Sequence, residues 1–194
     1  MPKGKNIGSL LRPLSEKPVQ AYFGEGLHTL GLLRWILAQT GPADVMVSSY
    51  STSEPFLNGC CILKDKGLIR QSMILLDQRA AAKTLRLERL LQGCFSHVFM
   101  GQNHSKILLV ANARHRVAVV TSQNQTYGLR AESTIITTDM GVYDTLLSQF
   151  TYICGSHAVE LDIANGKGIV TGMREAGQAA ADAKPDIRPF GFEW

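Results

Sequence analysis

Side chains that could bind and attack a phosphate are concentrated between residues 103 and 132. His104 and Lys106 alternate on one face of a segment that reads as extended, and Ser122 and Asn124 share one face further on. If the two intervening strands pair as a hairpin, all four side chains converge near one end of a sheet. Lysine supplies positive charge, serine and asparagine supply hydrogen bonds, and histidine can attack phosphorus or transfer a proton. This pattern predicts a phosphate site.

Glu132 is the acidic residue of this stretch. A carboxylate there could accept a hydrogen bond from an imidazole and fix its tautomer. The remaining histidines are explained as packed, solvated or helix-capping residues, and none has a lysine two positions further on: His28, His97, His115 and His157. The chain therefore carries a single His-x-Lys motif.

Helices and strands alternate along the chain, and they must position these side chains. Apolar spacing and capping signals predict helices at 26–39, 53–67, 78–92 and 142–153, and strands at 44–49, 72–76, 97–100, 106–110, 117–120 and 133–137. The alternation predicts an α/β domain whose sheet is largely buried.

The expected domain spans residues 23–172. Residues 1–22 form an N-terminal leader with little periodicity and without the apolar stretch of a secretory signal. Residues 173–194 form a tail that we expect to be partly ordered at best.

Composition describes an ordinary globular protein. Of 194 residues, 45% are hydrophobic and 19% are charged, which excludes a mostly disordered chain. A net charge of +4 permits a nucleic-acid partner, and no apolar run approaches the length of a membrane span, so no membrane association is expected. The four cysteines read as free thiols in a reducing cytoplasm: Cys60, Cys61, Cys94 and Cys154. No carboxylate cluster or Cys/His set has metal-ligand spacing, so neither a metal nor a cofactor is expected.

The spacing of the phosphate-site residues resembles the phospholipase D superfamily. His104-Ser105-Lys106 matches its HxK motif, the apolar residues 107–110 match the strand that follows, and Ser122-Gln123-Asn124 matches its Gly/Ser-x-Asn element. Glu132 stands where the bacterial nuclease branch places a glutamate. The resemblance covers about residues 24–154. It implies a phospholipase D/nuclease-like layered α/β/α domain with a mixed central sheet.

The resemblance also implies a reaction. It suggests a metal-independent phosphodiesterase, here an endonuclease, that works through a phosphohistidine. His104 of one subunit would attack phosphorus and the partner subunit's His104 would protonate the leaving oxygen, while Lys106, Asn124 and Ser122 hold the phosphate oxygens. Because this chemistry needs two HxK motifs and the chain has one, we expect a homodimer with a shared active site. Short single-motif members of the family dimerise in that way.

One position departs from the family motif. Ala111 stands five residues after Lys106, where the family has an aspartate of mainly structural role. This departure favours an alternative in which the chain is a non-catalytic homodimeric DNA-binding module with the same fold. A phosphatidyl transferase or lipid hydrolase ranks last, because no amphipathic membrane helix is evident.

Basic residues could extend the site. If residues 78–92 form one helix, its basic residues share one stripe: Arg79, Lys83, Arg86 and Arg89. Arg114 and Arg116 lie in a turn between two predicted strands. Both groups are interpreted either as solvated surface or as contacts to a nucleic-acid backbone near the active-site cleft.

Overall fold

A mixed eight-stranded sheet forms the centre of the protein, which we describe from a computed structural model covering residues 7–125 and 130–161. The strand order is β1-β7-β6-β5-β2-β3-β4-β8. The strands are β1 (Val19–Gly24), β2 (Ala43–Ser49), β3 (Ile69–Asp77), β4 (His97–Gly101), β5 (Ile107–Ala111), β6 (Arg116–Thr121), β7 (Glu132–Thr137) and β8 (Ala158–Glu160). β2, β3 and β4 are parallel to one another, and every other pairing is antiparallel.

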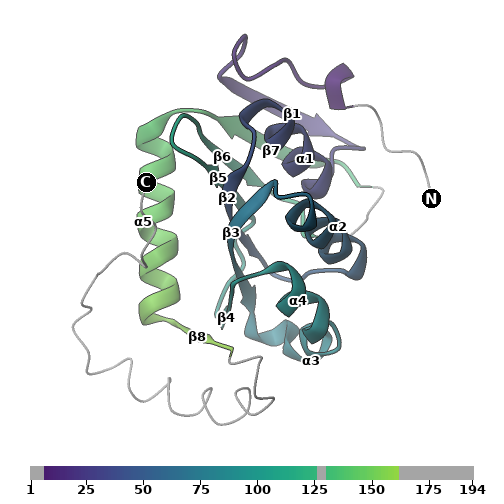
Figure 1. Cartoon of the computed structure of the whole chain (residues 1–194), viewed down its shortest axis with the longest axis vertical. Helices are drawn as coiled ribbons and strands as arrows, with labels where there is room; N and C mark the ends of the chain where they lie inside the picture. The colour runs from purple at the N-terminus through teal and green to yellow at the C-terminus, as the bar shows by residue number, and fades with distance from the viewer. Residues whose placement is uncertain (1–6, 126–129, 162–194) are drawn as a thin grey trace.

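Helices cover both faces of the sheet (Figure 1). One layer contains α1 (Thr29–Thr40), α2 (Glu54–Asp65), α3 (Ala81–Leu85) and α4 (Glu88–Cys94), and α5 (Met140–Ser156) lies on the opposite face. Short 3-10 turns at η1 (Ile7–Ser9) and η2 (Gln78–Ala80) complete the described elements. The arrangement confirms the expected layered α/β/α domain with a mixed sheet.

Burial on both faces explains the sequence of the central strands. All seven residues of β2 are buried, and they alternate between the two cores. Val47 packs in the core beneath α1 and α2, whereas Met46 packs with Tyr143 beneath α5. A strand covered on both sides must be apolar almost throughout, which is why β2 and β3 read as short continuous apolar runs.

The helix predicted at 78–92 is wrong as one continuous element. The chain forms η2, α3 and α4 instead, with a break at Arg86 and Leu87. The apolar period that suggested a single helix comes from Leu87, Leu90 and Leu91, which lie in α4 or at its start. The buried residues in the first half of the segment are Ala80 and Thr84, neither of which is a large apolar residue, so the apolar pattern could not reveal the break.

Two strands were not predicted. β1 pairs with β7 at one edge of the sheet and runs across the expected boundary at residue 22, so the last residues of the predicted leader belong to the sheet. Its large apolar residues Val19 and Phe23 are 57% and 79% exposed, whereas Gln20 is buried. This inverted pattern hides the strand from an analysis that expects apolar residues inside. β8 is only three residues long and pairs with β4.

The remaining boundary expectations fall at the C-terminus. Residues 162–172 of the expected domain and the predicted tail 173–194 lie outside the described residues. Within the described ranges, no helix combines the length and apolar character needed to cross a membrane.

The junction of β4 and β8 gives a stability prediction. A Cβ added at Gly101 would lie 2.9 Å from the backbone oxygen of His157 and 3.1 Å from the Cβ of Ala158. Because backbone must shift to relieve this contact, Gly101→Ala should lower the free energy of unfolding by about 1–3 kcal/mol.

Gly155→Ala is the matched control, because nothing lies within 4 Å of its added Cβ in α5. That variant should be neutral or stabilising by up to about 1 kcal/mol. Urea unfolding followed by circular dichroism measures both changes. Equal stability of the two variants would contradict the close packing of β8 on β4.

Candidate phosphate site

The two HxK side chains meet just before the start of β5. The Lys106 ammonium donates to the backbone oxygen of His104 at 2.7 Å and lies 3.2 Å from His104 Nδ1. His104 is exposed and Lys106 is half-buried. Burial lowers the pKa of Lys106, and the negative charge of Glu132 acts in the opposite direction. An exposed imidazole beside an ammonium can receive an anion from solvent.

Asn103 fixes the loop that carries the motif. Its Oδ1 accepts from the Ser105 backbone N–H at 3.0 Å and from Ser48 Oγ at 3.2 Å. Its Nδ2 donates to the backbone oxygens of Ser49 at 3.1 Å and Leu75 at 3.3 Å. The Asn103 side chain is therefore bonded to its own loop and to the ends of β2 and β3.

Asp77 adds a second attachment for the same loop. One carboxylate oxygen accepts from the Asn103 backbone N–H at 2.8 Å, and the other accepts from the Arg79 backbone N–H at 2.7 Å. Sequence reasoning missed both Asn103 and Asp77. The available signal was a polar residue near the end of each apolar strand, since Asp77 is the last residue of β3 and Asn103 lies two residues beyond β4.

The Ser122 element lies at the same end of the sheet. The Thr121 backbone N–H donates to the Lys106 backbone oxygen at 3.0 Å, which places the end of β6 beside the motif. Ser122 Oγ donates a short hydrogen bond to a Glu132 carboxylate oxygen and accepts from the Ser133 backbone N–H at 3.0 Å. In the described structure Glu132 hydrogen-bonds Ser122 and makes no hydrogen bond to His104.

Asn124 lies between two anchored glutamines. Gln123 Oε1 accepts from the Thr29 backbone N–H at 2.9 Å, and the Gln125 backbone N–H donates to Ser49 Oγ at 3.4 Å. Ser49 thus contacts both the Asn124 segment and Asn103, which brings the two halves of the predicted site together. Asn124 Oδ1 is buried and has no hydrogen-bond partner in the described part of the chain. A buried amide oxygen without a partner is costly, and a donor from a ligand or a water would satisfy it.

Tyr50 lies against the motif histidine. Its ring packs edge-on to the His104 ring, with the centroids 5.7 Å apart and the planes at 62°. Tyr50, which follows the last residue of β2, is therefore a further side chain in contact with His104.

The predicted basic residues fall into two separate places. The segment that holds Arg79, Lys83 and Arg86 begins beside the motif, because Asp77 bonds both Arg79 and Asn103. The break before α4 means that these residues do not form one helical stripe with Arg89.

Arg114 and Arg116 lie at the opposite end of β5 and β6. Lys106 and Ala111 are separated by five residues at about 3.4 Å each, or about 17 Å. Arg116 is held there by the Asp144 carboxylate at 3.0 Å. The interpretation that this pair contacts nucleic acid near the active-site cleft is therefore wrong about location.

At Ala111, where the family motif has an aspartate, a buried aspartate of the neighbouring strand lies alongside. Ala111 is buried and pairs in register with Asp44 of β2. The Asp44 carboxylate accepts from Arg70 Nη2 and from the Gln71 backbone N–H, both at 3.2 Å. A buried acid is thus present beside this position, supplied by the neighbouring strand.

Metal-binding side chains do not gather in the described residues: no group of three or more His, Cys, Asp or Glu is placed to hold an ion there. The four cysteines are free thiols, and burial raises the pKa of Cys154 to about 12.

Comparison with solved structures identifies the fold. The chain is similar to a phospholipase D family member, Nuc from Salmonella typhimurium, at 14% identity and a TM-score of 0.54, covering 74% of this chain and 98% of that chain. It is similar to phosphatidylserine synthase from Haemophilus influenzae at 12% identity and a TM-score of 0.56, covering 84% of this chain and 46% of that one. Polyphosphate kinase from Porphyromonas gingivalis matches at 14% identity and a TM-score of 0.51, over 70% of this chain and 26% of that one.

No family model matches the sequence, and no curated protein matches it. At these identities the likeness concerns the fold alone. The fold is the one seen in the phospholipase D superfamily, as the motif spacing predicted.

The coupling between Lys106 and Glu132 gives a titration prediction. Glu132→Gln removes a negative charge that favours the ammonium, so the pKa of Lys106 should fall further below its usual value. As pH rises, the variant should lose the Lys106 charge, and with it phosphate binding, at a lower pH than the unaltered protein does, because its Lys106 pKa is lower. NMR titration of the labelled Lys106 side chain measures the shift. Glu16→Gln, on the exposed N-terminal segment, should leave it unchanged, and an unchanged or raised Lys106 pKa in Glu132→Gln would contradict the coupling.

Proposed function

We propose that the protein is a metal-independent phosphodiesterase that cleaves nucleic acid as a homodimer. The observation that carries the proposal is the meeting of His104 and Lys106 at one end of the sheet, where Ser49 hydrogen-bonds both Asn103, next to His104, and Gln125, next to Asn124. An attack on phosphorus requires a nucleophile, a cation and a hydrogen-bond donor for the phosphate oxygens, and these are the groups that His104, Lys106 and the amide N–H of Asn124 offer.

The proposed reaction has two steps. A nitrogen of His104 attacks phosphorus, the P–O bond to the leaving group breaks, and the partner subunit's His104 donates its proton to the leaving oxygen. That partner histidine then removes a proton from water, the resulting hydroxide attacks phosphorus, and the P–N bond breaks to regenerate His104. Lys106 and Asn124 bind the non-bridging oxygens in both steps, so side chains balance the charge that develops.

Nucleic acid is the proposed substrate because of charge. The chain carries +4 overall, and the exposed Arg79, Lys83 and Arg86 follow directly from the Asp77 attachment of the motif loop. A polyanion that places one phosphate at His104 can bring its neighbouring phosphates to this segment.

Cleavage of supercoiled plasmid DNA and of single-stranded RNA in EDTA tests the activity. We expect wild-type cleavage, and a loss on the order of 10³-fold or more in His104→Ala, because nucleophile and acid disappear together. His97→Ala is the control of the same residue type, on β4, and should keep full activity.

Three outcomes would reject parts of this proposal. Full activity in His104→Ala removes the histidine mechanism. Loss of activity in EDTA that Mg²⁺ restores removes the metal-independent chemistry. Tight DNA binding without cleavage by wild type establishes the alternative, a non-catalytic DNA-binding module.

A second copy of the chain is the proposed source of the missing histidine, and an exposed apolar surface next to the site supports this. We call it the apolar strip. It consists of four side chains that are 43% to 79% exposed: Val19, Phe23, Val120 and Ile135. They share one face, since Ile135 pairs with Val120 on one side and Ala21 on the other, and Phe23 pairs with Ser133.

The apolar strip is continuous with the catalytic half-site. A shallow groove of ≈ 580 Å³ runs along it and includes Ser122 among its lining residues. The strip lies on the α5 face, because Val120 is two residues from Ala118 on β6 and shares its face, and Ala118 packs in the α5 core. Packing of this face against its copy across a two-fold axis would bury the strip and bring two half-sites together.

Phe23→Glu tests this interface, because the substitution places a charge in a surface that should be desolvated. We expect the dimer dissociation constant to rise by at least about 10-fold, with parallel loss of cleavage. Ile62→Glu is the matched control, since Ile62 is 49% exposed on α2, in the opposite layer. Analytical ultracentrifugation measures the association.

Subunit mixing distinguishes a shared site from two independent ones. Excess His104→Ala protein, allowed to exchange, should quench wild-type cleavage because each mixed dimer lacks one histidine. A wild-type protein that is monomeric and fully active contradicts the shared site.

A further inference from the structure

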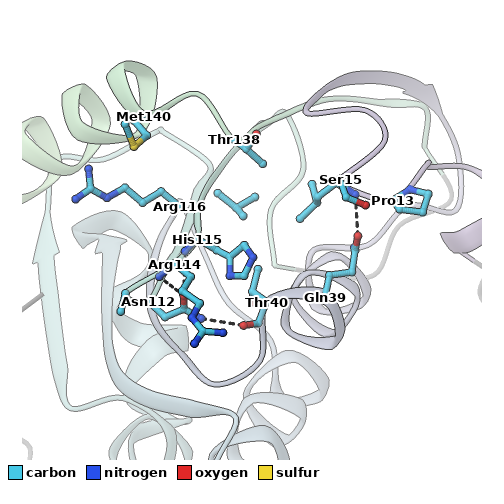
Figure 2. A pocket seen from close by; sticks show the side chains of 13 residues that line it. Pro13, Ser15, Gln39, Thr40, Asn112, Arg114, His115, Arg116, Thr138 and Met140 are labelled. Atoms are coloured by element: carbon cyan, nitrogen blue, oxygen red, sulfur yellow. Dashed lines mark hydrogen bonds between the residues drawn. The ribbon is translucent and has the colours of Figure 1, made fainter.

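A pocket of ≈ 880 Å³ lies at the opposite end of the sheet from His104 (Figure 2). Its walls come from the N-terminal segment at 13–15, the end of α1, the β5–β6 turn and the junction of β7 with α5. About 17 Å of β5 separates this end of the sheet from Lys106. A ligand here therefore does not occupy the phosphate site described above.

The framework of the pocket is held by side-chain hydrogen bonds. Asn112 Oδ1 accepts from the backbone N–H groups of Arg114 and His115 at 2.9 and 3.0 Å, which fixes the turn. Asn112 Nδ2 donates to the Thr40 backbone oxygen at 2.9 Å, which ties the turn to the end of α1. Gln39 Oε1 accepts from the Leu14 backbone N–H at 2.7 Å and joins the opposite wall to the same helix. The cavity is thus preformed.

The ionisable side chains that line the pocket are all basic. Arg114, His115 and Arg116 line the pocket, and none of its 13 lining residues is acidic. Arg116 is engaged by Asp144, and Figure 2 shows its side chain extending away from the other two. Arg114 and His115 are exposed, and their side chains have no hydrogen-bond or ion-pair partner in the described part of the chain. Two donors on a rigid turn are therefore free to bind an anion.

We propose that this pocket binds a small phosphate monoester of about nucleotide size. The planar guanidinium of Arg114 matches two phosphate oxygens, and His115 provides a further donor beside it. The volume lies within the range of small-molecule sites and exceeds what a single inorganic phosphate needs. Pro13, Leu14 and Met140 provide apolar surface for the organic part of the ligand.

This assignment goes beyond the proposed nuclease activity and does not depend on it. Calorimetric titration of the full chain with adenosine monophosphate, inorganic phosphate and adenosine tests it directly. We expect adenosine monophosphate to bind more tightly than phosphate, and adenosine to bind at least about 10-fold more weakly, because it lacks the anion.

Variants locate the binding. Arg114→Glu should weaken adenosine monophosphate binding at least about 10-fold, and His115→Ala should weaken it to a smaller extent. Lys106→Ala removes any binding at the phosphate site and should leave the Arg114-dependent affinity unchanged, as should Arg89→Ala, an exposed arginine on α4. Because the Arg114 side chain has no partner in the described structure, Arg114→Glu should unfold at the same urea concentration as wild type.

Three results would overturn the assignment. One is binding that Lys106→Ala abolishes and Arg114→Glu leaves intact, which places the ligand at the phosphate site. Another is equal affinity for adenosine and adenosine monophosphate. The third is no heat of binding at ligand concentrations up to about 10 mM.

Discussion

The Asn103 amide is the interaction on which the geometry of the phosphate site depends. The loop from β4 to β5 must cross the ends of β3 and β2, where backbone oxygens face out of the sheet. Asn103 covers two of them, at Leu75 and Ser49, and uses its own oxygen to hold the Ser105 backbone N–H. An apolar residue there would leave those groups without partners in a buried place, at a cost of about 1–3 kcal/mol each.

The strand order explains why so many polar groups meet at this end. β2 lies between a parallel neighbour, β3, and an antiparallel one, β5. The chain ends of β2 and β3 and the chain start of β5 therefore share one edge, which is the edge of an α/β sheet where ligands commonly bind. The end of β6 and the start of β7 lie at the same edge and supply Ser122 and Glu132. Convergence is thus a consequence of topology, and hydrogen bonds between neighbouring strand ends then fix the side chains in place.

The sequence predicted the local features of this arrangement well and the long-range ones poorly. The strands of the core and the HxK spacing were readable because apolar periodicity and motif distance are local. The Asn103–Asp77 and Gln123–Thr29 contacts join residues 26 and 94 positions apart, and nothing in one sequence marks such partners. The acid beside Ala111 was missed for the same reason, since it comes from Asp44 on a neighbouring strand.

β1 has an inverted pattern of burial. A half-buried strand normally turns its apolar face inward, yet β1 buries Gln20 and exposes Val19 and Phe23. Gln20 is buried because it hydrogen-bonds the Arg12 and Lys17 backbone oxygens and holds the N-terminal segment against the sheet.

Exposed apolar side chains on an edge strand favour association with another chain. Phe23 pairs with Ser133, whose backbone N–H donates to Ser122. Ser122 in turn donates to Glu132, the residue before Ser133 on β7. A partner that covered Phe23 would therefore lie one strand away from the Glu132 carboxylate. The feature that hid β1 from the sequence analysis is therefore the one that the proposed dimer requires.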